Sequence, residues 1–381
     1  MFRRFLLLVM LVVTFAEYSS SQVVVVIDSL PVNTPESDTI FLASSLNCWD
    51  THDSTYFFTR GKGGQLELLL PAEVDSFEFK LCRGSWLSVE MKSNGTDIPN
   101  RFLAKGTNDT ILLKVQAWRD LIPKKQIAST ATKGVRYLPT IFEIPQLKRK
   151  RTIRLYLPPN YSSGELFPVI YMHDGQNLFD NSTAFAGEWK VDEIMDSLYT
   201  YRGFSAIVVA VYNDDKERIN EYSPWKNDSL GIEGDGDKYA KFIANTLKPF
   251  IDRHYRTLSG RENTAIIGSS MGGLISLYIA LEYPDLFGNA AIFSPSIGVA
   301  PKLNDYLQKY KHKKFQHIYF LAGEKEGGTL VDDVNRAVEQ LKAIGFDDEH
   351  ELKVTIAPDG RHAEWFWSRE FGDAVRYMFN F

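Results

Sequence analysis

From about residue 136 to its end, the chain alternates buried-strand patterns with helical patterns, and this alternation constrains its fold most strongly. Apolar runs at residues 167–172, 206–211, 264–267, 290–293, 317–321 and 353–356 are separated by helical patterns at 190–198, 238–253, 271–282, 331–343 and 364–378. Apolar strands that alternate with helices are typical of a mostly parallel sheet covered by helices on both faces. The pattern predicts an α/β fold for residues 136–381.

The segment Gly268-Ser269-Ser270-Met271-Gly272 lies between the strand pattern at 264–267 and the helical pattern at 271–282. This is the setting in which a G-x-S-x-G segment turns sharply and presents its serine hydroxyl beside the positive end of a helix dipole. The alternative is a glycine-rich turn with an incidental serine. The strand and helix on either side favour Ser270 as a nucleophile.

A neutral serine hydroxyl needs a base. His362 follows the last strand pattern and precedes the last helical pattern, which is where an α/β-hydrolase places its base. A carboxylate should follow the preceding strand and orient the imidazole. Glu324 and Glu326 both stand there, and we expect one of them to be a solvated loop charge. The chain order Ser270, Glu326, His362 matches the order of this fold.

An oxyanion hole requires two backbone N–H donors. The amide of Met271 directly follows the candidate nucleophile, and the loop at residues 173–177 follows the strand pattern at 167–172. Within that loop the amide of Gln176 is the preferred second donor, and Gly175 comes next. His173 and Asp174 do not belong to a complete zinc or calcium motif, so we expect them to shape this loop and expect no metal.

Specificity should lie in loops such as residues 212–236. The candidates for substrate contacts are His173, Trp189, Tyr222 and Trp225. The alternative for the aromatic residues is packing within the protein, because aromatic side chains in loops often serve that purpose.

Residues 22–118 have a different pattern, with short β-rich runs at 23–27, 39–43, 65–70, 76–81 and 110–115 separated by Gly, Pro, Asn and Asp. Short strands with turn residues at this spacing predict a β-sandwich. Residues 119–135 are polar and basic without a strong pattern, and we expect a linker there. The whole chain is therefore expected to contain a β-sandwich, a linker and an α/β part.

The first 21 residues have the pattern of a cleaved signal peptide, with Arg3 and Arg4 before an apolar run and small residues before Gln22. An uncleaved N-terminal anchor is the alternative. Secretion to the cell exterior or the periplasm would permit a disulfide between Cys48 and Cys82, and two unpaired thiols are the other possibility.

Net charge argues against nucleic acid as a partner. The chain has 381 residues, a net charge of −5 and 24% charged residues, so it has no general attraction for polyanions. Its dense basic run, residues 148–151, lies between two strand-like segments and is expected to be a solvated turn. No run of 18 apolar residues follows the leader, so no membrane partner is expected after its removal. No motif indicates a cofactor.

Residues from about 136 to the end resemble the esterase D-type esterases, which include feruloyl, acetylxylan and enterochelin-type esterases. The resemblance is carried by five segments that start at His173, Glu221, Phe242, Gly268 and His362: HDGQNLF, EYSPW, FIANTLKPFID, GSSMGG and HAExxW. It implies an α/β-hydrolase fold, and it places the acid of the triad at Glu326, three residues after the glycine that ends its strand. Many members have Asp at that position.

The first part of the chain is similar to the starch- or glycogen-binding immunoglobulin-like domains. The matching segments are SLNCW at residues 45–49, FEFKLCRGSW at 77–86 and IPNR at 98–101. This resemblance implies that Trp49 and Trp86 stack on a sugar, whereas core packing is the alternative.

Together these patterns predict a secreted serine esterase that forms an acyl-enzyme and removes feruloyl- or acetyl-type groups from polysaccharide. The alternatives are an enterochelin-type siderophore esterase and a catalytically inactive glycan-binding protein.

Overall fold

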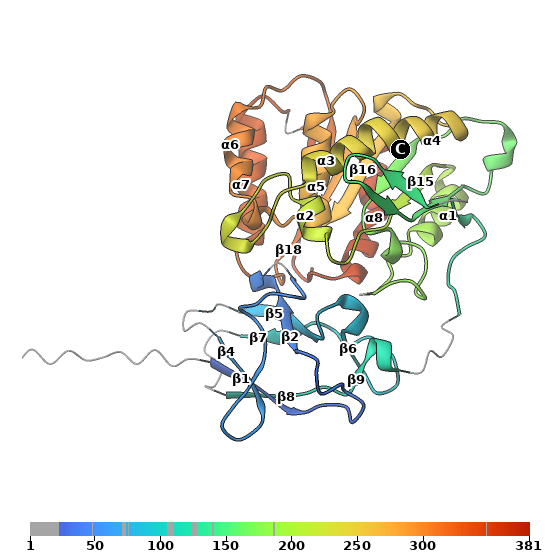
Figure 1. The fold of residues 1–381 in the computed structure, drawn as a ribbon. Coiled ribbons are helices and arrows are strands. Elements are labelled where there is room, and N and C mark those ends of the chain that lie inside the picture. Colours follow the sequence, from blue (N-terminus) through green and yellow to red (C-terminus); the bar gives the residue numbers. More distant parts are fainter. Residues whose placement is uncertain are drawn as a thin grey trace, which may run out of the picture.

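The computed structural model describes residues 23–47, 49–70, 74, 76–104, 110–122, 128–138, 141–185, 187–347 and 349–381. The chain forms an all-β part followed by a larger α/β part (Figure 1). The predicted signal peptide, residues 1–21, lies outside the described residues. Among the residues that are described, no helix is both long enough and apolar enough to cross a membrane.

The N-terminal part consists of short strands in two main sheets. One has the order β3-β4-β1-β8 and the other the order β2-β5-β7, while β6 and β9 form a separate ladder. Buried side chains from both main sheets, such as Val25, Phe79 and Leu113, share one apolar core, which confirms the predicted β-sandwich. The bounds are β1 (Val23–Ser29), β2 (Phe41–Ser44), β3 (Thr59–Arg60), β4 (Leu66–Leu70), β5 (Phe77–Cys82), β6 (Glu90–Met91), β7 (Arg101–Leu103), β8 (Thr110–Lys114) and β9 (Ala117–Trp118).

Cys82 at the end of β5 is a buried free thiol whose Sγ atom lies 3.7 Å from the carbonyl oxygen of Thr51. Burial raises the pKa of this thiol to about 12, so it is protonated at neutral pH. Cys48 lies outside the described residues, and its pairing with Cys82 stays a prediction.

The C-terminal part is built on an eight-stranded sheet with the order β10-β13-β15-β14-β16-β17-β18-β19. From β15 to β19 the neighbouring strands are parallel, whereas β13 is antiparallel to both β10 and β15. The bounds are β10 (Val135–Tyr137), β13 (Ile153–Tyr156), β14 (Val169–Met172), β15 (Ile207–Val211), β16 (Thr264–Ser269), β17 (Asn289–Phe293), β18 (His317–Gly323) and β19 (Leu352–Ala357).

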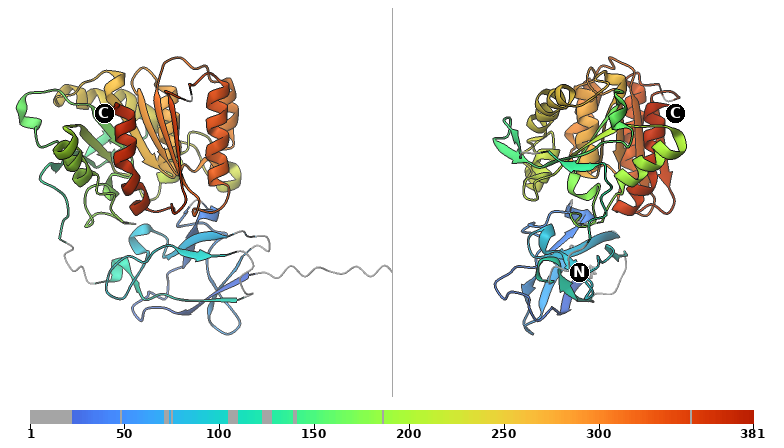
Figure 2. Two further views of the ribbon diagram at one scale, coloured as in Figure 1. Left: turned by 180° about the vertical axis from the view of Figure 1, so that it is seen from behind. Right: turned by 90° about the vertical axis from the view of Figure 1, so that its right-hand side faces the viewer.

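Helices cover both faces of this sheet, as Figure 2 shows, which confirms the predicted α/β-hydrolase architecture. Successive strand residues point to opposite faces, so Val169 and Tyr171 belong to one core while Ile170 and Met172 belong to the other. On the second face lie α1 (Val191–Arg202) and α8 (Glu364–Phe379). The first face carries α3 (Gly236–Phe242) with its continuation α4 (Lys248–His254), α5 (Met271–Glu282), α6 (Lys302–Lys309) and α7 (Leu330–Ala343).

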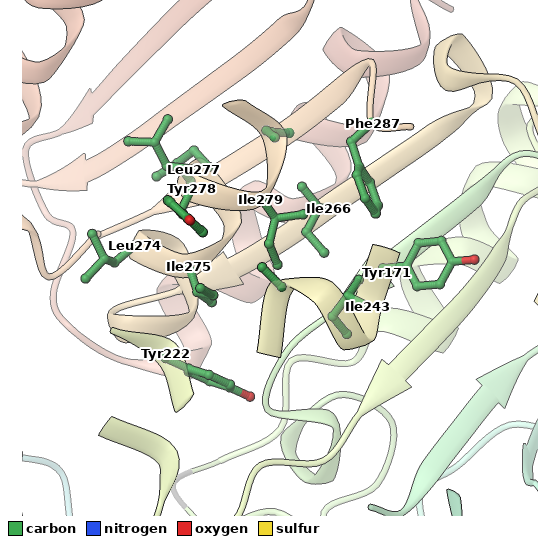
Figure 3. Close-up of a cluster of buried hydrophobic side chains, with 14 of the residues drawn as sticks. Tyr171, Tyr222, Ile243, Ile266, Leu274, Ile275, Leu277, Tyr278, Ile279 and Phe287 are labelled. Atoms are coloured by element: carbon green, nitrogen blue, oxygen red, sulfur yellow. The ribbon is translucent and has the colours of Figure 1, made fainter. Parts of the chain in front are cut away.

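Helix α5 is buried on every side, because each of its residues except Glu282 is buried. Figure 3 shows its side chains Leu274 and Ile279 packed among residues from neighbouring elements, including Ile266 of β16 and Tyr171 of β14. A helix that is apolar on all sides needs such an environment. Because α5 is buried in this way, its first turn, which directly follows Ser270, is held against the sheet.

The basic run at residues 148–151 forms part of a hairpin but is not fully solvated as predicted. Its strands are β11 (Phe142–Ile144) and β12 (Arg149–Arg151). Lys148 and Lys150 are exposed, whereas Arg151 is buried and donates to both carboxylate oxygens of Glu221, at 2.6 and 2.7 Å. Alternation along the strand turns every second basic residue inward, and a buried carboxylate neutralises it.

The sandwich covers the edge of the sheet where the parallel strands end (Figure 1). Within the predicted linker at 119–135, Arg119 donates to the carbonyl oxygens of Ala184 and Phe185, and the amide of Thr132 donates to Asp192 at 2.7 Å. The described ends of this segment are therefore attached to the α/β part, and the domain boundaries stay predictions. In an open α/β sheet, ligands bind outside the carboxyl ends of the strands, which is the edge that the sandwich covers.

Candidate active site

Ser270 stands at a sharp turn between β16 and α5. Its backbone has φ 57° and ψ −124°, a conformation that is strained for a residue with a side chain. Three backbone hydrogen bonds hold it: its N–H donates to the carbonyl of Phe293 at 2.9 Å, and its carbonyl accepts from the amides of Ser296 and Leu274, both at 3.1 Å. Strain at a position so firmly held is typical of a serine presented for reaction.

The glycines around Ser270 are required by close backbone contacts. A Cβ atom at Gly268 would lie 2.4 Å from the carbonyl oxygen of Gly272, and one at Gly273 would lie 2.9 Å from that of Phe293. The start of α5 can therefore approach β16 and β17 only if these positions lack side chains.

His362 and Glu326 lie in hydrogen-bond contact, with His362 Nδ1 2.7 Å from Glu326 Oε2. The other oxygen of Glu326 accepts from the hydroxyl of Ser294 and from the amide of Gly323, both at 2.7 Å. Glu326 is 3% exposed, whereas Glu324 is exposed to solvent and does not make this contact. The residue pattern left both glutamates as candidates for the partner of His362, and the geometry shows that Glu326 makes this contact.

The hydroxyl of Ser270 lies 3.1 Å from that of Ser296, which sequence reasoning missed. Ser296 stands in a Ser-Pro-Ser segment just after β17, and no local motif marks it. Ser270 and His362 both line one pocket. In the described hydrogen bonds Ser270 contacts Ser296 rather than His362, and catalytic hydrogen bonds often form only when substrate is bound.

The loop that follows β14 holds the second predicted oxyanion donor. Residues Gly175–Asn177 form a short 3₁₀ turn in which the side-chain oxygen of Gln176 accepts from the amide of Asn213 at 3.1 Å. A Cβ atom at Gly175 would lie 2.7 Å from the carbonyl carbon of Ala210, so this glycine is needed for packing against β15. Met271 is the first residue of α5, and its N–H has no acceptor within the helix.

Asp174 is the anchor of that loop. Its carboxylate accepts from Arg218 Nε at 2.8 Å and from Arg218 Nη2 at 2.9 Å. Burial alone would raise the pKa of Asp174, but the charge and hydrogen bonds of Arg218, together with the hydrogen bond from Asn213, hold that pKa below its usual value. A charged, bidentate pair of this kind fixes both partners.

Two of the four predicted substrate contacts lie away from the pocket because they are core residues. His173 is buried, contacts the Tyr239 hydroxyl through Nδ1 at 2.9 Å, and has its pKa lowered by burial to about 3. Tyr222 is 0% exposed. Both side chains pack against Tyr239, with ring centroids 5.5 and 5.2 Å away. The sequence signal for His173 was its place in the loop at residues 173–177, and that for Tyr222 was its place in the loop at residues 212–236. Packing explains both positions equally well.

The other two predicted contacts differ from each other. Trp225 packs against Tyr278 and Tyr306 of α5 and α6 rather than facing the pocket. Trp189 does line the pocket, and its ring stacks on that of Phe293 with centroids 5.6 Å apart.

Trp49 and Trp86 lie at the junction between the sandwich and the α/β part, where both line the pocket that contains Ser270. Both side chains also pack against a small buried cluster of the sandwich that contains Cys82, and sugar stacking by these two residues stays a prediction. Trp86 stacks on Phe185, with centroids 5.7 Å apart. Both tryptophans also border a second groove, whose lining includes Asp215 and Lys216.

The pocket encloses about 590 Å³, counting the part that is open to solvent. Aromatic and polar residues from both parts of the chain form its walls. Sequence reasoning did not assign several of them to the site: Asn177, Glu364 and Trp367 lie within the HDGQNLF and HAExxW segments, whereas the residues of the sandwich have no local pattern that marks them. Those that were missed are Lys80, Asn100, Asn177, Phe185, Arg218, Glu364 and Trp367.

Two of these residues are buried and ionisable. Burial lowers the pKa of the Lys80 ammonium, although the carboxylates of Asp97 and Glu364 act in the opposite direction. Burial raises the pKa of the Glu364 carboxyl to about 8, which favours its neutral form. Its Oε1 atom lies 3.3 Å from Asn177 Nδ2.

One group of carboxylates within the described ranges has ligand atoms close enough together to hold a metal ion. It comprises Glu188, Asp192 and Glu193 near the start of α1, with those atoms within 4.8 Å of one another. None of the three lines the pocket. The carboxylate of Asp192 instead accepts a hydrogen bond from the amide of Thr132. This group of carboxylates therefore helps to attach the segment before β10 to α1.

Comparison with known proteins gives consistent matches. Residues 144–369 match the sequence family described as "Putative esterase". The uncharacterized protein YjcH of Bacillus subtilis is 30% identical over 245 residues, which cover 61% of this chain and 93% of that protein. The endo-1,4-beta-xylanase/feruloyl esterase of Xylanibacter ruminicola is 28% identical over 207 residues, covering 53% of this chain and 26% of that protein.

A solved structure resembles both parts of the chain. The enterobactin esterase FES from Shigella flexneri, determined in the presence of enterobactin, matches with a TM-score of 0.54 over 90% of this chain and 88% of that chain. The two sequences are 16% identical, so the likeness concerns the fold.

Proposed function

The chain belongs to the "Putative esterase" family, which makes it a carboxylic ester hydrolase, and we propose that it works through an acyl-enzyme formed at Ser270. The observation that carries the proposal is the contact of His362 with Glu326 beside a strained Ser270, all at the carboxyl edge of the sheet. Nucleophile, base and orienting carboxylate are the three parts that such a mechanism requires.

In the proposed mechanism, Nε2 of His362 takes the proton of the Ser270 hydroxyl while Oγ attacks the ester carbonyl. Glu326 holds Nδ1 and stabilises the imidazolium that forms. The amides of Met271 and Gln176 donate to the oxyanion, and the N-terminus of α5 adds partial positive charge. The tetrahedral intermediate then expels the alcohol, which receives the proton from His362. In the second half, His362 activates water to release the acid.

We propose a feruloyl-type acyl group as the preferred substrate, carried on a polysaccharide and met outside the cell or in the periplasm. The walls of the pocket support a planar aromatic acyl group, because Trp86, Trp189 and Trp367 all line it. The second groove, which shares Trp49, Trp86 and Arg218 with the pocket, offers a path for a bulky alcohol. A relative whose name includes feruloyl esterase also supports this choice. Secretion rests on the leader pattern of residues 1–21.

The first test is labelling with a fluorophosphonate probe, using the wild type beside Ser270→Ala and His362→Ala. Labelling of the wild type alone is expected. Hydrolysis of methyl ferulate and of acetylated or feruloylated xylan oligomers would then identify the acyl group. A folded wild type that hydrolyses no ester and is not labelled would contradict the proposal, and retention on immobilised glycan would then favour a binding role.

A siderophore ester is the second candidate substrate, and two observations favour it. The likeness to the enterobactin esterase extends over both parts of the chain. The basic side chains of Lys80 and Arg218 also line the pocket, although burial lowers the pKa of Lys80 and Arg218 is paired with Asp174. Release of catecholate monomers from a cyclic triester, with no release of ferulate from xylan oligomers, would select this candidate.

A further inference from the structure

The face of the β-sandwich that meets the α/β part contains buried charge. In β5, apolar residues alternate with Glu78 and Lys80, yet all six residues of the strand are buried. The α/β part covers the side of the strand on which these two charged residues stand: Glu78 contacts Arg361, and Lys80 lines the pocket. Burying a charge costs free energy unless the charge is paired. We therefore expect the partners of Glu78 at this contact to be held in fixed positions.

The two oxygens of Glu78 reach the segment that carries His362. Glu78 Oε1 accepts from Arg361 Nη1 at 3.2 Å, and Oε2 accepts from Asn100 Nδ2 at 3.1 Å. Asn100 Nδ2 also donates to the carbonyl oxygen of His362 at 3.1 Å. One buried carboxylate thus connects two residues of the His362 loop with the sandwich.

The ring of His362 is enclosed from the same side. Trp49 of the sandwich stacks on it with ring centroids 6.1 Å apart and 11° between the planes, while Trp367 of α8 meets it edge-on at 5.0 Å. On the α/β side, the loop is held by Glu326 at Nδ1 and by the amide of Lys325, which donates to the carbonyl of Gly360 at 3.0 Å. Among the described residues, the donor to the His362 carbonyl is Asn100.

We propose that Glu78 and Asn100 are positioning residues for His362, so that the sandwich is part of the catalytic apparatus. The inference rests on the proposed role of His362 as the base. The imidazole must lie within hydrogen-bond reach of Ser270 Oγ, and a displacement of about 1 Å can cost about 100-fold in rate. Glu326 restrains one ring atom, whereas Asn100 restrains the backbone from which the ring extends.

Asn100→Ala is the direct test, because it removes the donor to His362 without altering a residue that we assign to the chemistry. We expect kcat and the rate of fluorophosphonate labelling at saturating probe to fall together by about 10-fold or more, with KM changed less than about twofold. Asn33→Ala is the matched control: Asn33 is an exposed sandwich residue, and both rates should stay at the wild-type values.

The Arg361 contact gives a second, independent test. Arg361→Ala leaves the buried carboxylate of Glu78 without this cation and should lower kcat, whereas Arg361→Lys should restore part of the loss because it keeps the charge. Wild-type kcat and labelling rates in both alanine variants would overturn the proposal. A loss that appears only as a lower melting temperature, with kcat unchanged in the folded fraction, would also overturn it. Absence of labelling in the wild type would instead contradict the proposed function itself.

Discussion

Nδ1 of His362 lies 2.7 Å from Oε2 of Glu326, and this contact distinguishes Glu326 from Glu324, two residues away. The backbone explains the difference. The amide of Gly323 donates to Oε1 of Glu326 at 2.7 Å, so the turn after β18 folds this side chain back into the protein. The side chain of Glu324 points to solvent.

Replacing Glu326 with glutamine should therefore lower kcat by about 10⁴-fold, because a neutral amide orients the imidazole poorly and does not stabilise the imidazolium. Steady-state hydrolysis of a 4-nitrophenyl ester would measure this. Glu324→Gln is the matched control and should behave as the wild type. Equal losses in the two variants, or a loss in Glu324→Gln alone, would show that the acid has been assigned to the wrong glutamate.

Gly268→Ala should destabilise the fold. The added Cβ would lie 2.4 Å from the carbonyl oxygen of Gly272, and backbone cannot move aside cheaply at the junction of β16 and α5. We expect a loss of about 1–3 kcal/mol, or more, in the free energy of unfolding measured with urea.

Gly372→Ala supplies a control of the opposite sign. Gly372 lies inside α8, and an added Cβ would come no closer than 3.6 Å to Ile194, an ordinary contact. Alanine in a helix interior should stabilise by about 1 kcal/mol. If the two variants lose stability equally, the close contact at Gly268 is not what requires the glycine.

Trp86→Ala should weaken substrate binding rather than glycan retention. Trp86 stands in the wall of the pocket, where it stacks on Phe185. Loss of an aromatic partner worth about 1 kcal/mol should raise KM for methyl ferulate roughly 3- to 10-fold. Trp365→Ala is the control, because Trp365 is exposed and does not line the pocket. Unchanged KM together with lost retention on immobilised starch or xylan would instead support the sugar-stacking role.

The sequence predicts the elements of the α/β part well because periodicity is a local property. Helix α5 has the bounds predicted, Met271–Glu282, and the G-x-S-x-G segment specifies its own turn through contacts among nearby residues. The contact between the sandwich and the α/β part is formed by residues far apart in the sequence, so no local sequence pattern predicts it. An alternation like that of β5 usually marks one solvated face, yet docking of the α/β part buries Glu78 and Lys80.

The same reason explains the positions of Trp49 and Trp86. A tryptophan on a sandwich surface has the same sequence pattern whether it meets a sugar or another domain. Only the docked structure shows that Trp49 stacks on His362.

The pocket should also respond to pH through Glu364. Burial raises the pKa of this carboxyl to about 8, above the usual value of 4.5, while Lys80 acts in the opposite direction with a smaller effect. The folded protein thus binds this proton more tightly than the unfolded chain does. The stabilisation is complete below about pH 4.5 and is lost progressively as the pH rises to about 8.

Glu364→Gln keeps the neutral shape of the carboxyl at every pH, so it isolates this contribution. We expect the melting temperature of the variant, relative to the wild type, to increase between pH 5 and pH 9. The alkaline decline of kcat/KM should also weaken, because the variant does not place a new negative charge in the pocket near the developing oxyanion. A difference in melting temperature that is constant over this range would mean that Glu364 is already ionised at pH 5, held in that state by the ammonium of Lys80.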